Sequence, residues 1–120
     1  MAAGAPDGTE GTKMTTELQA PVRAVIDAAN NGDLDGFLAG FTDDGVVDDW
    51  GREFSGAARI RAWSDAEFIG RQVSLAVQSV QILNGETVVS AQVGGNGFNG
   101  PSHFAFRVSG DRVSRMTIRA

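Results

Sequence analysis

Apolar positions recur at helical spacing in three stretches of the first seventy residues. The first predicted helix follows Thr16, which can form a capping box with Gln19, and it ends at Asn30-Asn31-Gly32. The second begins at Asp33, a good N-cap, and the third opens at Ser55-Gly56. The inward positions expected along these helices are Leu18, Val22, Val25, Ile26 and Ala29, then Leu34, Phe37, Leu38 and Phe41, then Ala57, Ile60 and Trp63.

The rest of the chain alternates between apolar and polar residues, as strands do. A turn at Thr42–Gly45 and a hairpin turn at Asn84-Gly85 are predicted. The apolar positions change phase near Gln78-Ser79, which indicates a bulge that bends the sheet. The predicted strands are Val46–Trp50, Arg52–Phe54, Gln72–Leu83, Thr87–Gly94, Ser102–Ser109 and Arg112–Arg119.

Helices first and a long bent meander last predict an α+β fold. We expect a cone, with three N-terminal helices packed on a strongly curved, mainly antiparallel mixed sheet, and a pocket enclosed between them. Residues 15–120 form one domain in this interpretation. Residues 1–14, rich in Gly and Ala, are expected to be a disordered leader or a cloning remnant.

The amino-acid composition excludes several kinds of catalytic and metal-binding site. The 120 residues include no Cys, no Tyr and a single His, so thiolate catalysis, Cys-based metal sites and phenol donors are excluded. We expect neither a metal nor an organic cofactor. The net charge of −5 argues against a nucleic-acid partner, and no apolar run is long enough for a membrane helix. A cytoplasmic protein is the expectation.

Three motifs carry a family resemblance: Asn31–Asp35, Phe41–Asp49 and Ser55–Arg61. Together they resemble the nuclear transport factor 2-like superfamily, and most closely its small bacterial SnoaL-like group of polyketide cyclases and the ketosteroid isomerases. The resemblance implies a catalytic base at Asp49. It places the acid donors of the isomerases at Val25 and Ser102, where neither residue replaces a phenol or a neutral carboxylic acid.

Asp48 and Asp49 are consecutive on a predicted strand, so their side chains should point to opposite faces. The resemblance favours Asp49 as the inward residue and leaves Asp48 facing solvent. Apolar surroundings would raise the pKa of Asp49 toward the range useful for a general base. The alternative is that Asp49 only accepts a hydrogen bond from a backbone amide near the strand end.

The expected cavity wall combines aromatic residues with one hydroxyl. Trp50 and Trp63 could stack on a flat ring and donate indole hydrogen bonds, or serve only as core residues. The other expected lining residues are Phe37, Phe41, Phe54, Phe104 and Ser102.

Two tempting motifs are given structural interpretations. His103 alternates with Phe104 and Phe106, so it should lie on the outer sheet face, where a homodimer contact is expected. Gly95–Gly100 has the spacing of a dinucleotide fingerprint, but a strand rather than a helix follows it. It is expected to be a loop at the pocket rim, with Phe98 as a lid.

The sequence therefore predicts a protein that binds a small apolar or cyclic molecule. One hypothesis is a cofactor-free isomerase, cyclase or dehydratase with Asp49 as its base. The alternatives are a non-catalytic binding or dimerisation module, and a domain with a filled core and protein partners only.

Overall fold

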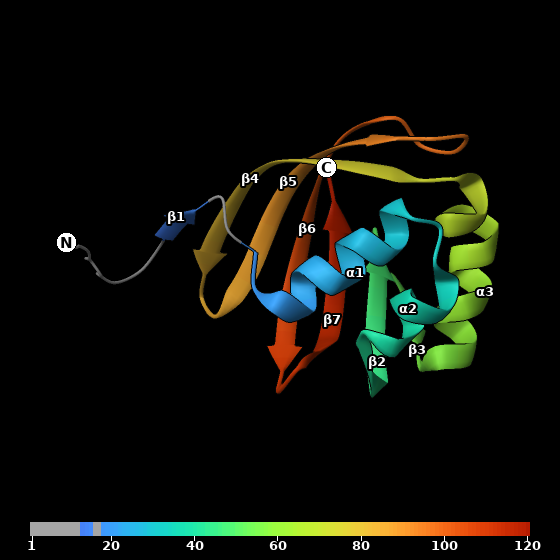
Figure 1. Ribbon diagram of the computed structural model, residues 1–120, viewed down its shortest axis with the longest axis horizontal. Helices are drawn as coiled ribbons and strands as arrows, with labels where there is room; N and C mark the ends of the chain where they lie inside the picture. The colour runs from blue at the N-terminus through green and yellow to red at the C-terminus, as the bar shows by residue number, and fades with distance from the viewer. Residues whose placement is uncertain (1–12, 16–17) are drawn as a thin grey trace.

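The computed structural model describes residues 13–15 and 18–120, with side chains from Leu18 onward. The predicted α+β order is confirmed (Figure 1). The elements are β1 (Lys13–Thr15), α1 (Ala20–Asn30), α2 (Leu34–Ala39), β2 (Phe41–Asp49), β3 (Arg52–Ser55), α3 (Ala57–Glu67), the 3₁₀ turn η3 (Ile69–Arg71), β4 (Ser74–Leu83), β5 (Glu86–Gly94), β6 (Gly100–Ser109) and β7 (Arg112–Arg119).

The first two helices begin where their local chemistry allows. Pro21 occupies the first turn of α1, where its missing N–H costs no hydrogen bond. Thr16, the expected capping partner of Gln19, lies outside the described residues, and Gln19 makes no side-chain cap. Asp33 caps α2 as predicted, since its Oδ1 accepts the Gly36 N–H at 3.0 Å.

The strand β2 departs from the prediction at both ends. The expected Thr42–Gly45 turn lies inside β2, where the register against β7 shifts between Phe41 and Val46. Phe41 therefore starts the strand instead of extending the apolar face of α2. Trp50, expected in the strand, occupies the turn into β3 with φ of 56°. The alternation of apolar and polar residues indicated neither the register shift inside β2 nor the end of the strand before Trp50.

One mixed sheet of seven strands holds the molecule together, in the order β1-β4-β5-β6-β7-β2-β3. The β2–β7 pair is parallel and the other pairs are antiparallel. The predicted bulge is confirmed, because the β4–β5 register shifts between Val77 and Ser79. The β1 strand pairs with the edge of β4, so Lys13 and Met14 take part in the sheet although the sequence assigns them to a leader.

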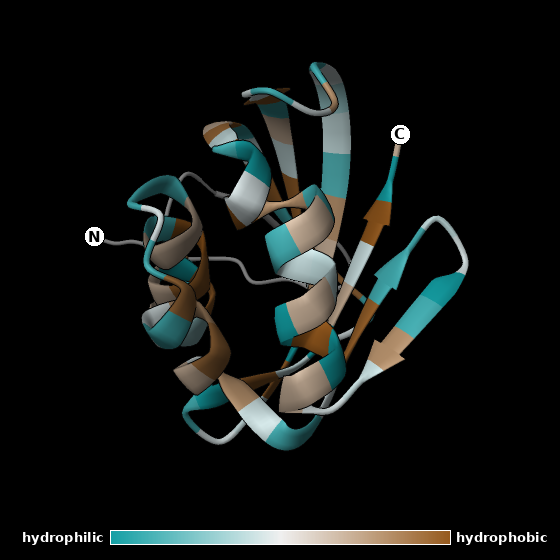
Figure 2. Cartoon of the chain, turned by 90° about the vertical axis from the view of Figure 1, so that its right-hand side faces the viewer, coloured by the Kyte–Doolittle hydropathy of each residue, from teal (hydrophilic) through white to brown (hydrophobic). Residues whose placement is uncertain are grey.

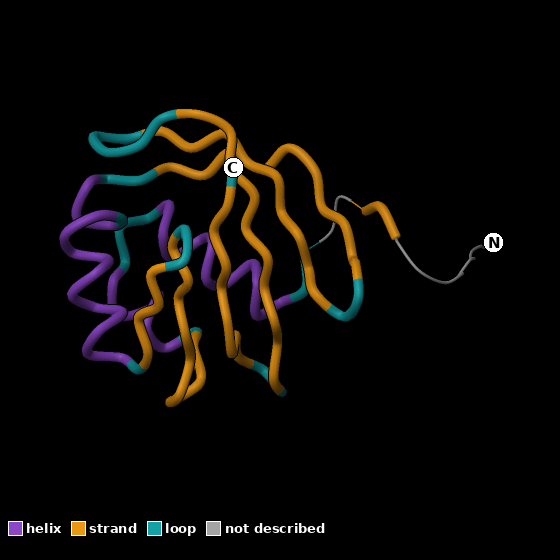
Figure 3. Tube along the Cα trace, turned by 180° about the vertical axis from the view of Figure 1, so that it is seen from behind, coloured by secondary structure: helices purple, strands orange, loops and turns teal. Residues whose placement is uncertain are grey.

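The helices lie on one face of this curved sheet, and within residues 13–15 and 18–120 no helix lies on the other face (Figures 1 and 3). Brown apolar and teal polar residues alternate along the strands and helices, as Figure 2 shows. The fully buried centre includes Val22 and Val25 of α1, Phe37 of α2 and Phe106 of β6. On α3 burial begins at Ile60, so Ala57 is exposed rather than inward as expected. The expected cone of three helices on a curved mixed sheet is confirmed.

Candidate active site

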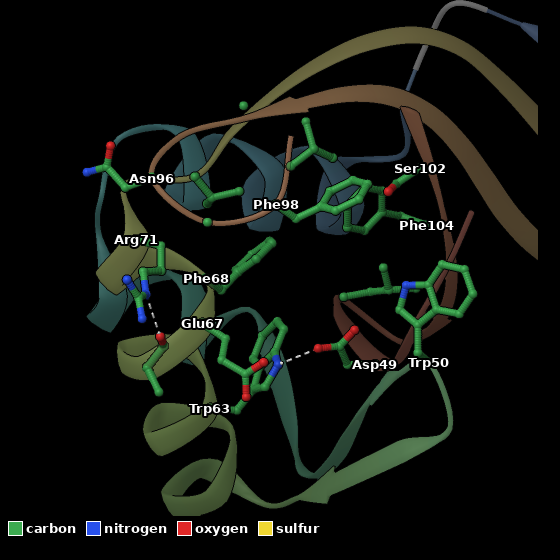
Figure 4. Close-up of a pocket in the computed structure, with 16 residues that line it drawn as sticks. Asp49, Trp50, Trp63, Glu67, Phe68, Arg71, Asn96, Phe98, Ser102 and Phe104 are labelled. Carbon is green, nitrogen blue, oxygen red and sulfur yellow. Dashed lines mark hydrogen bonds between the residues drawn. The ribbon is translucent and has the colours of Figure 1, made fainter. Parts of the chain in front are cut away.

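A cavity of about 490 Å³ lies between α3, η3 and the inner face of the sheet. Pockets of about 300–1,000 Å³ suit small organic ligands. Apolar and aromatic side chains form most of its wall, with a few charged groups among them (Figure 4). The lining residues are Asp49, Trp50, Trp63, Ala66, Glu67, Phe68, Arg71, Val73, Val93, Gly94, Asn96, Gly97, Phe98, Ser102, Phe104 and Ile118.

Asp49 reaches the cavity from the end of β2. Its position follows from strand alternation, because Val47 on the same face is fully buried in the core. The Asp49 side chain is 16 % exposed. Its Oδ2 accepts a hydrogen bond from Trp63 Nε1 at 3.0 Å and one from Arg52 Nη2 at 2.6 Å. Asp49 therefore lies at a polar edge of an apolar cavity.

Arg52 joins two carboxylates at the pocket rim. Its Nη1 donates to Glu67 Oε2 at 3.0 Å, and its Nη2 donates to Glu67 Oε1 at 2.7 Å. Nη2 also donates the hydrogen bond to Asp49. The hydrogen bond from Arg52 lowers the pKa of Glu67, against the opposing effect of burial. The same bond is the largest cause of a raised pKa for Arg52. This ion pair ties β3 to the C-terminal end of α3.

Asp48 does not face solvent as expected. It lies on the outer sheet face, yet only 6 % of it is exposed because arginines from β7 cover it. Arg119 donates to both carboxylate oxygens at 3.0 and 3.2 Å, and Arg115 donates to Oδ2 at 3.0 Å. The Gly51 N–H donates to Oδ1 at 2.8 Å. The backbone contact considered for Asp49 therefore belongs to Asp48.

These contacts set the charge of Asp48. The Arg119 hydrogen bond is the largest cause that lowers its pKa, with further contributions from the Gly51 amide and Arg115. Burial alone would raise that pKa. Asp48 is thus an ionised structural group on the face away from the cavity.

Four of the expected wall residues line the cavity. Trp63 is buried and stacks on Phe68, with ring centroids 4.8 Å apart. Ser102 and Phe104 are buried on the inner face of β6. Trp50 also lines the cavity but is 58 % exposed at the hairpin turn, so it forms part of the mouth.

The other three expected wall residues lie outside the lining. Phe37 and Phe41 are core residues in edge-to-face contact, with ring centroids 5.2 Å apart. The Phe37 ring also packs near Phe68, with centroids 5.6 Å apart, and the Phe54 ring lies 6.1 Å from Trp63. The sequence identified these rings as apolar but carried no information on which layer of aromatic residues meets the cavity.

The charged residues Glu67 and Arg71 line the pocket although the sequence did not single them out. No helical spacing marked the pair, because α3 ends at Glu67 and Arg71 lies in η3 after the break at Phe68. Phe68, whose ring forms part of the wall, was hidden because the helical period breaks at the start of η3.

The Gly95–Gly100 segment lies at the rim, as expected, with Asn96, Gly97 and Phe98 in the lining. The Asn96 N–H donates to the Arg71 carbonyl at 2.8 Å, which fastens the loop to η3. A Cβ on Gly95, where φ is +124°, would come within 2.7 Å of the Gln72 carbonyl oxygen, so glycine permits this close approach. Phe98 lines the cavity while 58 % exposed. A role for Phe98 as a lid stays a prediction.

The resemblance placed the acid donors of the isomerases at Val25 and Ser102. Val25 is buried in the core on α1 and does not line the cavity, whereas Ser102 does. His103 is exposed on the outer face, as predicted. Across residues 18–120 no group of three or more His, Asp or Glu side chains is arranged to hold a metal ion. In the same part of the chain no helix is long and apolar enough to cross a membrane.

Solved structures share this fold. A proposed polyketide cyclase from Sinorhizobium meliloti aligns with a TM-score of 0.77 and 24 % identity, over 85 % of this chain and 95 % of that chain. A Catenulispora acidiphila protein with a ketosteroid isomerase-like fold, in complex with trimethylamine, has a TM-score of 0.70 and 19 % identity. The alignment covers 83 % of this chain and 84 % of that chain. A Mycobacterium tuberculosis protein in complex with estradiol-17beta-hemisuccinate has a TM-score of 0.71 and 15 % identity, over 85 % and 95 %.

Comparison with known sequences identifies the family of the chain. A search of curated proteins finds no match to the chain. The family model described as "SnoaL-like domain" matches residues 22–116, which include Asp49 and every lining residue of the cavity except Ile118. The protein therefore belongs to the SnoaL-like domain family.

Proposed function

We propose that the cavity binds a compact ring-bearing or carbonyl-containing molecule and that Asp49 accepts and returns a proton in a cofactor-free isomerisation, cyclisation or dehydration. The observation that carries this proposal is one carboxylate at the edge of a cavity whose walls are Phe68, Phe104, Val73 and Val93. A carboxylate so placed can remove a proton from a carbon next to a carbonyl group. The ligands named for the solved relatives, a steroid ester and a small amine, support a small-molecule role for the fold.

Asp49 has the pairing that a positioned base needs. Trp63 and Arg52 both bind Oδ2, so Oδ1 has no hydrogen-bond partner within the described residues. That oxygen is available to a substrate. The stacked pair of Trp63 and Phe68 supplies a flat apolar surface on which a ring can rest next to Asp49.

Ligand binding can be measured on the two indole N–H signals, because the chain contains only two Trp residues and both line the cavity. We expect 2-tetralone, a bicyclic ketone, to shift the Trp63 signal in NMR titrations. Val93→Phe, which fills the cavity from β5, should abolish the shift while circular dichroism shows an unchanged fold. Binding that survives in a folded Val93→Phe protein would place the ligand elsewhere.

A non-catalytic binding module is the second candidate, favoured by the missing strong acid donors at Val25 and Ser102. Asp49→Asn distinguishes the two functions, since the amide oxygen can still accept the Trp63 hydrogen bond. A pure binder keeps its affinity and has no turnover to lose. A base-dependent enzyme keeps the fold and loses turnover.

We also propose a homodimer formed through the outer sheet face, where His103, Ala105 and Thr117 lie on neighbouring strands. Among the described residues, no helix covers this part of the sheet (Figure 3). Light scattering should report twice the monomer mass of 12.6 kDa. A monomer at high protein concentration would contradict the proposal.

A further inference from the structure

The charged groups of the cavity are unevenly distributed. Asp49 and Trp50 lie on one side of the cavity, and Arg71 and Asn96 lie on the opposite side, next to the β5–β6 loop (Figure 4). Glu67 lies along the wall between them. A ligand that fills the cavity therefore meets a carboxylate at one end and a guanidinium at the other.

The two arginines near the cavity differ in their pairing. Arg52 is fully engaged, because its two terminal nitrogens make three hydrogen bonds to Glu67 and Asp49. Arg71 uses only Nε, which donates to the Ala66 carbonyl at 3.0 Å. Within residues 18–120 no hydrogen bond or ion pair is found for its Nη1 and Nη2. The bond at Nε fixes one edge of the guanidinium plane and leaves the terminal donors for another acceptor.

The local charge balance permits an anion at this end. Asp49 and Glu67 contribute two negative charges, and Arg52 and Arg71 contribute two positive charges, so the four groups sum to zero. Arg52 pairs with both carboxylates at close range and leaves one net negative charge among these three groups. Arg71 makes no such close ion pair with either carboxylate within the described residues, and its charge acts on Glu67 only over a longer distance. An incoming carboxylate would be repelled from the Asp49 end and attracted to the Arg71 end.

The backbone around Arg71 is held in place. The loop is attached by the Asn96 N–H to the Arg71 carbonyl, and Gly97 passes so close that a Cβ there would lie 3.4 Å from the Arg71 Cβ and Cγ. The aliphatic stem of Arg71 is therefore packed under the loop, and its exposed guanidinium is turned toward the Ala66 carbonyl at the edge of the cavity (Figure 4).

From this arrangement we infer that the natural ligand is an amphipathic acid. Its ring rests against Phe68 and Phe104, its carboxylate pairs with the terminal nitrogens of Arg71, and its reactive end lies at Asp49. The inference rests on the proposed function of the cavity and adds the chemical class and the orientation of the ligand. An isolated carboxylate on Arg71 gains little because water competes, whereas a ring in the cavity brings the carboxylate to Arg71 without a separate cost in entropy.

The test compares three probes with one ring system: naphthalene-2-acetic acid, its uncharged amide, and 2-(naphthalen-2-yl)ethylamine. Their affinities are measured by NMR titration of the Trp63 indole signal. We expect the acid to bind about five- to tenfold more tightly than the amide, as for a partly exposed charge-assisted pair. Added salt should weaken binding of the acid and leave the amide unchanged.

Arg71→Gln should bring the ratio of acid to amide affinity close to one. Arg59→Gln, the same change at an exposed position of α3 outside the cavity lining, should leave the ratio unchanged. If Arg71→Gln folds poorly, Arg71→Lys replaces it, and it should keep a smaller preference for the acid because the charge remains without the planar fork.

Equal binding of acid and amide to the wild-type protein, or tightest binding of the amine, would overturn the inference and leave the cavity as a binding site. A preference for the acid that persists in Arg71→Gln would overturn it as well. If none of the three probes binds, the proposed function of the cavity fails, and the inference fails with it.

Discussion

At the scale of single residues, the adjacent acids Asp48 and Asp49 take different roles because the strand turns them to opposite faces. Alternation made that division predictable, and the family resemblance identified the inward member. The burial of Asp48 could not be foreseen in the same way. It depends on Arg115 and Arg119, which are distant in sequence and reach Asp48 only because β7 pairs in parallel with β2.

The Asp48 cluster leads to a stability prediction. Asp48→Asn should lower the free energy of unfolding at pH 7 by about 1–3 kcal/mol, since it removes the charge that two arginines share. Urea denaturation measures the change, and Asp65→Asn at an exposed position should shift the value by less than about 0.5 kcal/mol.

The pH dependence of that loss follows from the lowered pKa of Asp48. A carboxyl whose folded-state pKa is lowered contributes stability above its unfolded value of about 3.9, and this contribution is lost as the pH falls through the folded-state pKa. The difference between wild type and Asp48→Asn should therefore shrink below about pH 4. An equal difference at pH 7 and pH 2.5 would contradict the assignment.

At the scale of elements, the Gly95–Gly100 segment was predictable as a loop from local patterns, but its contacts were not. Its glycines predicted a loop, and the strand that follows it excluded a nucleotide fingerprint. The attachment to η3 through Asn96 and the close approach of Gly95 to Gln72 are tertiary contacts with no local signature. The β4 bulge was predictable, by contrast, because the alternation of apolar and polar residues changes phase between Val77 and Val80 within the β4 sequence.

A substitution at Gly95, compared with one at Gly110 in the turn between β6 and β7, measures the cost of disturbing the contact between the loop and Gln72. Gly95→Ala should destabilise the protein by about 2–3 kcal/mol, because it combines positive φ with a contact of 2.7 Å to the Gln72 carbonyl oxygen. Gly110→Ala has positive φ and open space around it, so its cost should be about 1 kcal/mol. Thermal melts compare the two variants, and equal costs would mean that the close approach contributes nothing to the fold.

At the scale of the whole molecule, the cone fold and its cavity were predictable from the sequence. The residues that line the cavity were predictable only in part. The order of helices and the bent meander specify a curved sheet covered on one face. Which aromatic rings meet the cavity depends on the tilt of α3 and on the break at η3. Phe68 consequently takes the place that the sequence suggested for Phe37, Phe41 and Phe54.

The central claim is that Asp49 moves protons on a molecule held in the cavity. The most direct measurement is the exchange of the α-hydrogens of 2-tetralone for deuterium in D₂O, followed by ¹H NMR with and without protein. The account predicts that the wild type and Asp65→Asn accelerate the exchange, and that Asp49→Asn loses this acceleration by about 100-fold or more while it still binds the ketone. Exchange at the wild-type rate in Asp49→Asn would contradict the account, as would a wild-type rate equal to that of buffer alone.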